Sequence, residues 1–148
     1  MTDEREYLPS PAGWVRDQVE LYESSGGTKG HTLRETGLPV IIVTMVGHRT
    51  GAIRKIALMR VEHEGEYALV ASLGGAPKNP VWYQNLMADP ASATIQDGPE
   101  PFGVDIREVF AEERATWWAR AAAAFPPYSE YQDRTDRVIP VLVAKRRD

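Results

Sequence analysis

Residues 40–61 constrain the fold of this chain more than any other segment. Four consecutive β-branched residues at positions 40–43 lead into a turn bounded by Gly47 and Gly51, and a second apolar run follows from Ile53. β-Branched side chains favour extended backbone, and glycine allows turns that other residues resist. The segment therefore predicts two strands joined by a short turn.

The same hairpin reverses the charge of the chain locally. Residues 36–61 contain no aspartate or glutamate, although the chain has 21 acidic and 17 basic residues and a formal net charge of −4. The basic residues of the segment are His48, Arg49, Arg54, Lys55 and Arg60. Backbone N–H groups freed by a glycine-rich turn, next to several cations, suit a phosphate or polycarboxylate. A hairpin whose basic residues are only solvated explains the pattern equally well.

Length and composition indicate one globular domain. The chain has 148 residues, of which 43% are hydrophobic and 26% charged, and it has no cysteine, which excludes disulfides, thiolate metal sites and a cysteine nucleophile. The acidic balance argues against a general nucleic-acid binder, and three scattered histidines lack the spacing of metal ligands. We find no signal peptide and no apolar run near the ~18 residues of a membrane span, so we expect a cytoplasmic protein.

The order of predicted elements favours an antiparallel sheet or barrel in an α+β fold. Residues 1–13 read as a loose arm, and residues 28–38 and 73–80 as loops. Pro80 can begin a helix with Val81, Trp82, Leu86 and Met87 at its apolar positions. Helices are also predicted over 14–22, 112–124 and 128–135, and strands over 40–46, 53–63, 66–72, 91–96, 102–110 and 138–144.

Two further segments could contribute to a binding site. Ser72, Gly74 and Gly75 follow an apolar strand, where glycines permit close backbone approach to a flat ligand, although a plain loop needs such glycines too. Lys78 could add a cation, but most loop lysines are only solvated. Trp82 fits a core position better than a ligand contact, and Tyr83 suits either role.

Tyr128 and Tyr131 are three residues apart, so they share one face of a helix. Together they could form a pocket wall and donate a hydrogen bond or proton, or one of them could belong to the core. Asp133, Arg134, Asp136 and Arg137 alternate in sign and read most simply as surface or intrahelical ion pairs. No hydrolytic motif is present, so we expect hard chemistry to come from a bound organic cofactor.

Three separated motifs together resemble the deazaflavin-dependent nitroreductase family of actinobacteria, whose members use reduced coenzyme F420. They are residues 44–51, residues 72–83, and residues 128–132 with Thr135, Asp136 and Arg137. The resemblance spans most of the chain in the right order and implies a single oxidoreductase domain with a split β-barrel fold related to FMN-binding proteins. It also implies a cofactor whose phosphate and oligoglutamate tail follows a basic groove.

Carried over by position, the resemblance implies particular site residues. The turn that would bind the tail comprises His48, Arg49, Thr50, Gly51, Arg54 and Lys55. The loop against the ring and ribityl chain, with its flanking residues, comprises Ser72, Leu73, Gly74, Gly75, Ala76, Lys78, Trp82 and Tyr83. Tyr128 and Tyr131 match tyrosines on the substrate side and are the catalytic candidates.

This chain departs from the family pattern at four positions. The turn usually reads Gly-Arg-Lys-Thr-Gly, so His48 lowers the charge at neutral pH while Arg49 keeps a cation. Leu73 stands where the loop usually has lysine, and Phe125 where a tyrosine is frequent.

The activity implied is hydride transfer from the reduced deazaflavin to a quinone, nitroaromatic or activated enone. The resemblance leaves room for a homodimer and, where the acceptor is a quinone, for peripheral membrane contact. Two other interpretations stay open: a barrel that binds FMN or a haem-like ligand, and a carrier of deazaflavin or lipid without turnover.

Overall fold

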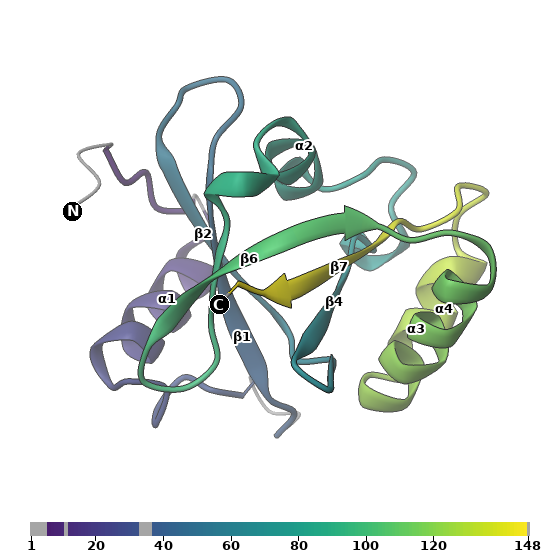
Figure 1. The fold of residues 1–148 in the computed structure, drawn as a ribbon, viewed down its shortest axis with the longest axis horizontal. Coiled ribbons are helices and arrows are strands. Elements are labelled where there is room, and N and C mark those ends of the chain that lie inside the picture. Colours follow the sequence, from purple (N-terminus) through teal and green to yellow (C-terminus); the bar gives the residue numbers. More distant parts are fainter. Residues whose placement is uncertain (1–5, 11, 33–36, 148) are drawn as a thin grey trace.

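Strands of one antiparallel sheet form the framework of the protein (Figure 1). The computed structural model describes residues 6–10, 12–32 and 37–147. Within them the sheet has seven strands in the order β2-β1-β5-β6-β7-β4-β3. Their bounds are β1 Val40–Val46, β2 Ile53–Met59, β3 Glu62–His63, β4 Glu66–Val70, β5 Thr94–Gln96, β6 Pro101–Glu108 and β7 Val141–Arg146. The helices are α1 Gly13–Ser24, α2 Val81–Ala88, α3 Ala111–Ala124 and α4 Pro127–Asp133, with 3-10 turns η1 Leu73–Gly75 and η2 Pro90–Ser92.

The sheet is curled. Its two end strands are consecutive in the chain, so the two ends of the sheet must lie close together. β2 and β3 lie at opposite ends of the strand order, yet only Arg60 and Val61 separate them. The Ala68 N–H of β4 donates to the Val61 carbonyl at 2.8 Å, which brings the two ends together. The predicted single strand over 53–63 is therefore wrong: the chain bends at residues 60–61 to pass from one end of the sheet to the other. The predicted α+β class with an antiparallel sheet is confirmed, and the structure shows that this sheet is curled.

The apolar run of β1 is buried on both of its faces. Val40 and Ile42 pack with side chains of α1, α3 and α4, among them Val19 and Tyr22. Ile41, Val43 and Met45 face a second cluster, which includes Leu86 of α2 and strand residues such as Leu69, Ile95 and Leu142. Successive residues of a strand point to opposite faces, so a strand covered on both sides needs the unbroken apolar sequence found at 40–43.

Several predicted element bounds and faces change in the structure. The strand expected over 91–96 begins as the turn η2, since Pro90 suits the first position of such a turn, and only Thr94–Gln96 is strand. The last strand begins at Val141 rather than at Val138, whose side chain is 70% exposed. In α2 only Leu86 of the four predicted apolar positions is fully buried, while Val81 and Met87 are exposed. A helix of 8 residues touches the sheet with one narrow face.

Part of the predicted N-terminal arm is held against β2. The Ile53 N–H donates to the Glu6 carbonyl at 2.7 Å, and the Leu8 N–H donates to the Ile53 carbonyl at 2.9 Å. This pairing carries Ser10 to the edge of the pocket described below. Residues 1–5 and 11 of the arm lie outside the described residues.

Candidate functional site

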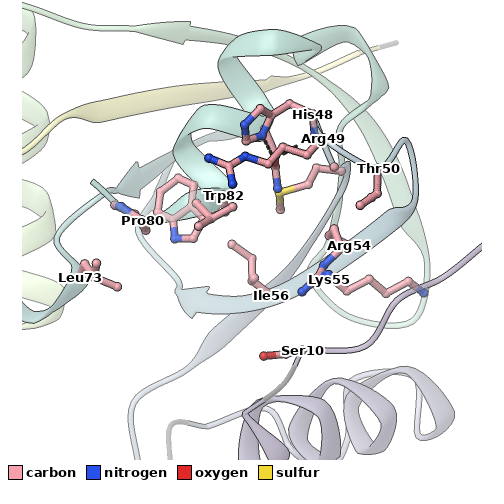
Figure 2. Close-up of a pocket in the computed structure, with 14 residues that line it drawn as sticks. Ser10, His48, Arg49, Thr50, Arg54, Lys55, Ile56, Leu73, Pro80 and Trp82 are labelled. Atoms are coloured by element: carbon pink, nitrogen blue, oxygen red, sulfur yellow. Dashed lines mark hydrogen bonds between the residues drawn. The ribbon is translucent and has the colours of Figure 1, made fainter. Parts of the chain in front are cut away.

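A pocket of about 510 Å³ lies where the β1–β2 turn meets β2, η1 and the beginning of α2 (Figure 2). The predicted site residues that line it are His48, Arg49, Thr50, Arg54, Lys55, Leu73 and Trp82. It is also lined by Ser10, Met45, Gly47, Ile56, Pro80, Val81 and Asn85. The structure thus brings the basic turn, one residue of the loop at 72–76 (the glycine loop) and the start of the following helix around one space.

Backbone hydrogen bonds define the shape of the β1–β2 turn. The Gly47 N–H donates to the Ala52 carbonyl at 2.7 Å, and the Gly51 N–H donates to the Gly47 carbonyl at 2.8 Å. Gly51 has φ +71°, the left-handed region that favours glycine. The Thr50 hydroxyl accepts the Ala52 N–H at 3.1 Å. Thr50 and Gly51 therefore serve first to hold the turn in shape.

Asn85 of α2 anchors this turn through hydrogen bonds to His48. Its side-chain oxygen accepts the backbone N–H of His48 at 3.0 Å and lies 2.5 Å from His48 Nδ1. An oxygen in that place requires a proton on Nδ1, so the neutral imidazole has Nε2 as its free acceptor. Asn85 is only 5% exposed. Asn85 is a site residue that could not be identified from its residue type, because a second amide, Gln84, directly precedes it in α2; the available signal was its place in the helix that follows the second motif.

The basic residues of the hairpin divide into paired and unpaired groups. Lys55 Nζ contacts Glu23 Oε2 of α1 at 2.5 Å and also lies over the Tyr7 ring. Arg60 donates from Nε to both oxygens of Asp97, at 2.9 and 3.1 Å, and does not line the pocket. Arg49 and Arg54 have no carboxylate partner within the described part of the chain. The positive charge that the pocket offers to a ligand therefore comes chiefly from two arginines.

The remainder of the pocket is apolar. Figure 2 shows Trp82 and Ile56 facing the space, with Leu73 and Pro80 at the end away from Arg54. Leu73 is 46% exposed and Val81 65%, which are high values for large apolar side chains. Trp82 thus contributes to the pocket wall as well as packing partly against the core. A pocket lined both by cations and by exposed apolar surface suits a ligand with an anionic tail and a flat ring.

The glycine loop touches α4 more than it touches the pocket. Leu73, Gly74 and Gly75 all have positive φ, at +46°, +63° and +82°. A Cβ at Gly75 would lie 2.6 Å from the Tyr131 carbonyl oxygen, so glycine is required there for close packing on α4. Ser72 is buried and precedes the turn. Among the predicted loop residues, Ser72, Gly74, Gly75, Ala76 and Lys78 do not line the pocket.

Arg137 is a residue whose role sequence reasoning missed. The expectation of a surface or intrahelical ion pair is wrong for it, because its guanidinium donates to the carbonyls of Ala71, Ser72 and Ala76. The signal available in the sequence was only its place in the third motif.

Three tyrosines predicted for the site do not line the pocket. Tyr83 donates its hydroxyl to Glu108 of β6, and burial together with this carboxylate raises its pKa to about 12. Tyr128 is 5% exposed within the core, where its ring packs at 5.0 Å from that of Phe125. Burial raises the pKa of Tyr128 well above its usual value, so its phenol stays protonated at neutral pH. Tyr131 shares α4 with Tyr128, as expected, and lies under Arg134.

Comparison with known proteins identifies relatives across nearly the whole chain. The model of the F420H(2)-dependent quinone reductase family matches residues 14–146. An F420H(2)-dependent quinone reductase of Mycobacterium tuberculosis is 33% identical over 130 residues, covering 86% of each chain. A second protein of that organism, called a putative F420H(2)-dependent quinone reductase, is 28% identical over 110 residues, covering 74% of this chain and 92% of its own.

Two solved structures share the fold. An F420-H2 dependent reductase (FDR-A) is 45% identical with a TM-score of 0.68, covering 78% of this chain and 98% of its own. A chain described as a domain-swapped dimer is 44% identical with a TM-score of 0.70, covering 92% of this chain and 100% of its own. The predicted family is thereby confirmed, and this chain belongs to the F420H(2)-dependent quinone reductase family.

Proposed function

We propose that this protein is an oxidoreductase that transfers a hydride from reduced coenzyme F420 to a quinone. The observation that carries the proposal is the pocket itself, which is lined both by two arginines without a carboxylate partner among the described residues and by the apolar side chains of Ile56, Leu73 and Trp82. Coenzyme F420 has both characters, a flat deazaflavin ring and a tail with phosphate and glutamate carboxylates. Nitroaromatics and activated enones share the electron-poor character of quinones and are further acceptors under this proposal.

The residues present fit this cofactor. Arg49 and Arg54 would bind the anionic tail, with the His48–Gly51 turn beside them held rigid by Asn85. Trp82, Ile56 and Leu73 would line the flat ring and exclude water from one side of it. We further propose that the curled sheet is a split β-barrel of the type found in FMN-binding proteins, a fold that this pocket arrangement supports. The group supplies, when bound, a hydride from its C5 carbon in a two-electron step.

A quinone that receives a hydride also needs one proton to become a hydroquinone. Solvent can deliver it through the open side of the pocket, where His48 and Thr50 are exposed. Tyr128 and Tyr131 stay predicted as substrate-side residues from the resemblance. Since the phenol of Tyr128 is protonated at neutral pH, its only role in proton transfer there would be to donate a proton. A Tyr128→Phe variant with unchanged turnover would remove it from that role.

Titration with coenzyme F420 beside FMN is the test of this function. We expect micromolar binding of coenzyme F420, weaker binding of FMN, and oxidation of the reduced deazaflavin on addition of menadione. No binding at tens of micromolar would contradict the proposal. Preferential binding of FMN would support the flavin-binding alternative, and binding without menadione-dependent oxidation would indicate a carrier.

Assembly and location extend the proposal. One relative of 44% identity is described as a domain-swapped dimer, which supports a homodimer for this chain as well. No helix within the described residues is long and apolar enough to cross a bilayer. A cytoplasmic location, with peripheral membrane contact when the acceptor is a lipid-soluble quinone, stays a prediction.

A further inference from the structure

Arg137 lies under the loop of residues 71–79 and contacts it at both ends. Its Nη1 donates to the Ala71 carbonyl at 3.1 Å and to Asn79 Oδ1 at 3.0 Å. Its Nη2 donates to the Ser72 carbonyl at 2.5 Å, and its Nε donates to the Ala76 carbonyl at 2.8 Å. These contacts use four of the five N–H donors of a guanidinium and connect positions 58–66 residues away.

No carboxylate lies within ion-pair distance of this guanidinium in the described part of the chain. Its charge is therefore balanced by the oxygens of the loop. Partial burial lowers the pKa of Arg137 from its usual value, but an arginine stays protonated at any working pH. Hydrogen bonds from a charged donor are roughly twice as strong as neutral ones. Four such bonds to one loop therefore restrict the conformations that the loop can adopt.

The constrained loop needs this support, because its conformation is unfavourable. Leu73 has φ +46°, a left-handed conformation that L side chains rarely adopt, and two glycines with positive φ follow it. Such residues persist where the surroundings dictate them. Leu73 is also the residue of the loop that lines the pocket. Arg137 thus acts on the backbone on both sides of a strained residue that forms the pocket wall.

The backbone of Arg137 is itself fixed by α4. Gln132 donates from Nε2 to the Arg137 carbonyl at 2.7 Å, and the Arg137 N–H donates to the Thr135 hydroxyl at 3.2 Å. The other side of Gln132 accepts the Ile139 N–H at 3.0 Å. The guanidinium therefore extends from a backbone that has little freedom, and it transmits the position of α4 to the loop.

We infer that Arg137 is a positioning residue for the cofactor pocket, which holds the Leu73 wall in its ring-binding conformation through the carbonyls of the 71–79 loop. The inference rests on the proposed function for the identity of the ligand. It assigns to Arg137 no contact with cofactor or substrate. Its action depends on the planar fork of the guanidinium, which a lysine ammonium cannot reproduce over several acceptors.

Two substitutions separate geometry from charge. Arg137→Met removes fork and charge, whereas Arg137→Lys keeps the charge and loses the fork. We expect both to raise the dissociation constant for coenzyme F420 about tenfold, which corresponds to ~1.4 kcal/mol. In both, the amides of residues 72–79 should exchange hydrogen faster in the cofactor-free protein, and the KM for the cofactor should rise while kcat stays within about twofold. Arg147→Met is the matched control, because Arg147 donates to Val104 and Asp105 away from the pocket.

The outcomes distinguish this inference from the proposed function. If Arg137→Lys binds coenzyme F420 as tightly as the wild type, only the charge at position 137 matters and the inference is overturned. Unchanged amide exchange in Arg137→Met would overturn it as well. A loss of thermal stability with unchanged cofactor affinity would show a merely structural role and also overturn it. If Arg137→Met does not fold, Asn79→Ala, which removes one acceptor, should show the same changes to a smaller extent. If the wild type binds no coenzyme F420, the proposed function fails while the exchange measurement still decides whether Arg137 holds the loop.

Discussion

At the scale of single residues, the chemistry of the pocket depends on which cations have partners. Lys55 and Arg54 are neighbours in β2, and both line the pocket. The ammonium of Lys55 contacts Glu23, whereas Arg54 has no carboxylate partner among the described residues. An anionic ligand therefore meets the full charge of Arg54 and a largely compensated charge at Lys55.

Substitutions at Arg54 and at Glu23 should change the affinity for coenzyme F420 in opposite directions. Arg54→Met should weaken binding about tenfold, since it removes an unpaired charge that a phosphate or carboxylate can contact. Glu23→Gln should tighten binding about threefold, because it releases Lys55 and removes a nearby negative charge. Fluorescence titration at low ionic strength measures both.

Glu112→Gln is the control for net charge, as Glu112 is an exposed residue of α3 outside the pocket. It should leave the dissociation constant unchanged. An unchanged complex with Glu23→Gln would show that the charge of Lys55 takes no part in binding the tail, and a weaker one would show that the Glu23–Lys55 pair supports the site instead.

At the scale of elements, the contact between the glycine loop and α4 determines how the pocket wall is placed. Gly74 and Gly75 both have left-handed backbone, but their surroundings differ. A Cβ at Gly74 would meet nothing within 4 Å, whereas one at Gly75 would overlap the Tyr131 carbonyl oxygen. The two positions therefore separate backbone strain from close packing.

Alanine at these two glycines should have unequal effects on stability. Gly74→Ala should lower the free energy of unfolding by about 1 kcal/mol, the cost of a left-handed alanine. Gly75→Ala should cost at least about 3 kcal/mol, because the loop must also move away from α4. Urea denaturation of the two variants gives both values. Equal losses would mean that the loop can separate from α4 without cost.

At the scale of the whole molecule, one carboxylate connects parts of the sheet that are distant in the strand order. Asp97, in the turn after β5, accepts from Arg60 next to β2 and from the Tyr67 hydroxyl of β4 at 2.7 Å. The next residue, Gly98, donates its N–H to the Tyr22 hydroxyl of α1 at 2.8 Å. Burial and the Asp97 carboxylate raise the pKa of Tyr67 well above its usual value, which keeps the phenol a donor. The turn thereby helps to keep the sheet curled.

Removal of this carboxylate should destabilise the whole fold. Asp97→Ala should lower the free energy of unfolding by about 2–3 kcal/mol, because it leaves a partly buried arginine and a buried phenol without their acceptor. Asp105→Ala is the matched control, since its pair with Arg147 has side chains 71% and 44% exposed. That change should stay within about 0.5 kcal/mol. A similar loss for both variants would mean that Asp97 contributes no more than a surface ion pair.

Local patterns in the sequence were sufficient for most elements and for the family, but not for the bend at residues 60–61 that divides the strand predicted over 53–63. The β-branched run at 40–43, the glycines of the turn and the acid-free surroundings of Arg49 and Arg54 are neighbours in the chain. They act through backbone propensity and short-range electrostatics, so the hairpin and its concentration of basic residues could be predicted. The three motifs were sufficient for the family because each is contiguous or nearly so.

Only the tertiary structure decided which of these groups work together. Lys55 and Glu23 are 32 residues apart, and Arg137 meets its acceptors across 58–66 residues. Pairings of this kind follow from how the curled sheet and its helices pack, which no local propensity encodes. The sequence by itself determined a basic β-hairpin and the order of elements around it. The fold decided that two arginines supply the free charge, that Gly75 serves contact with α4, and that Arg137 supports the loop instead of forming a surface ion pair.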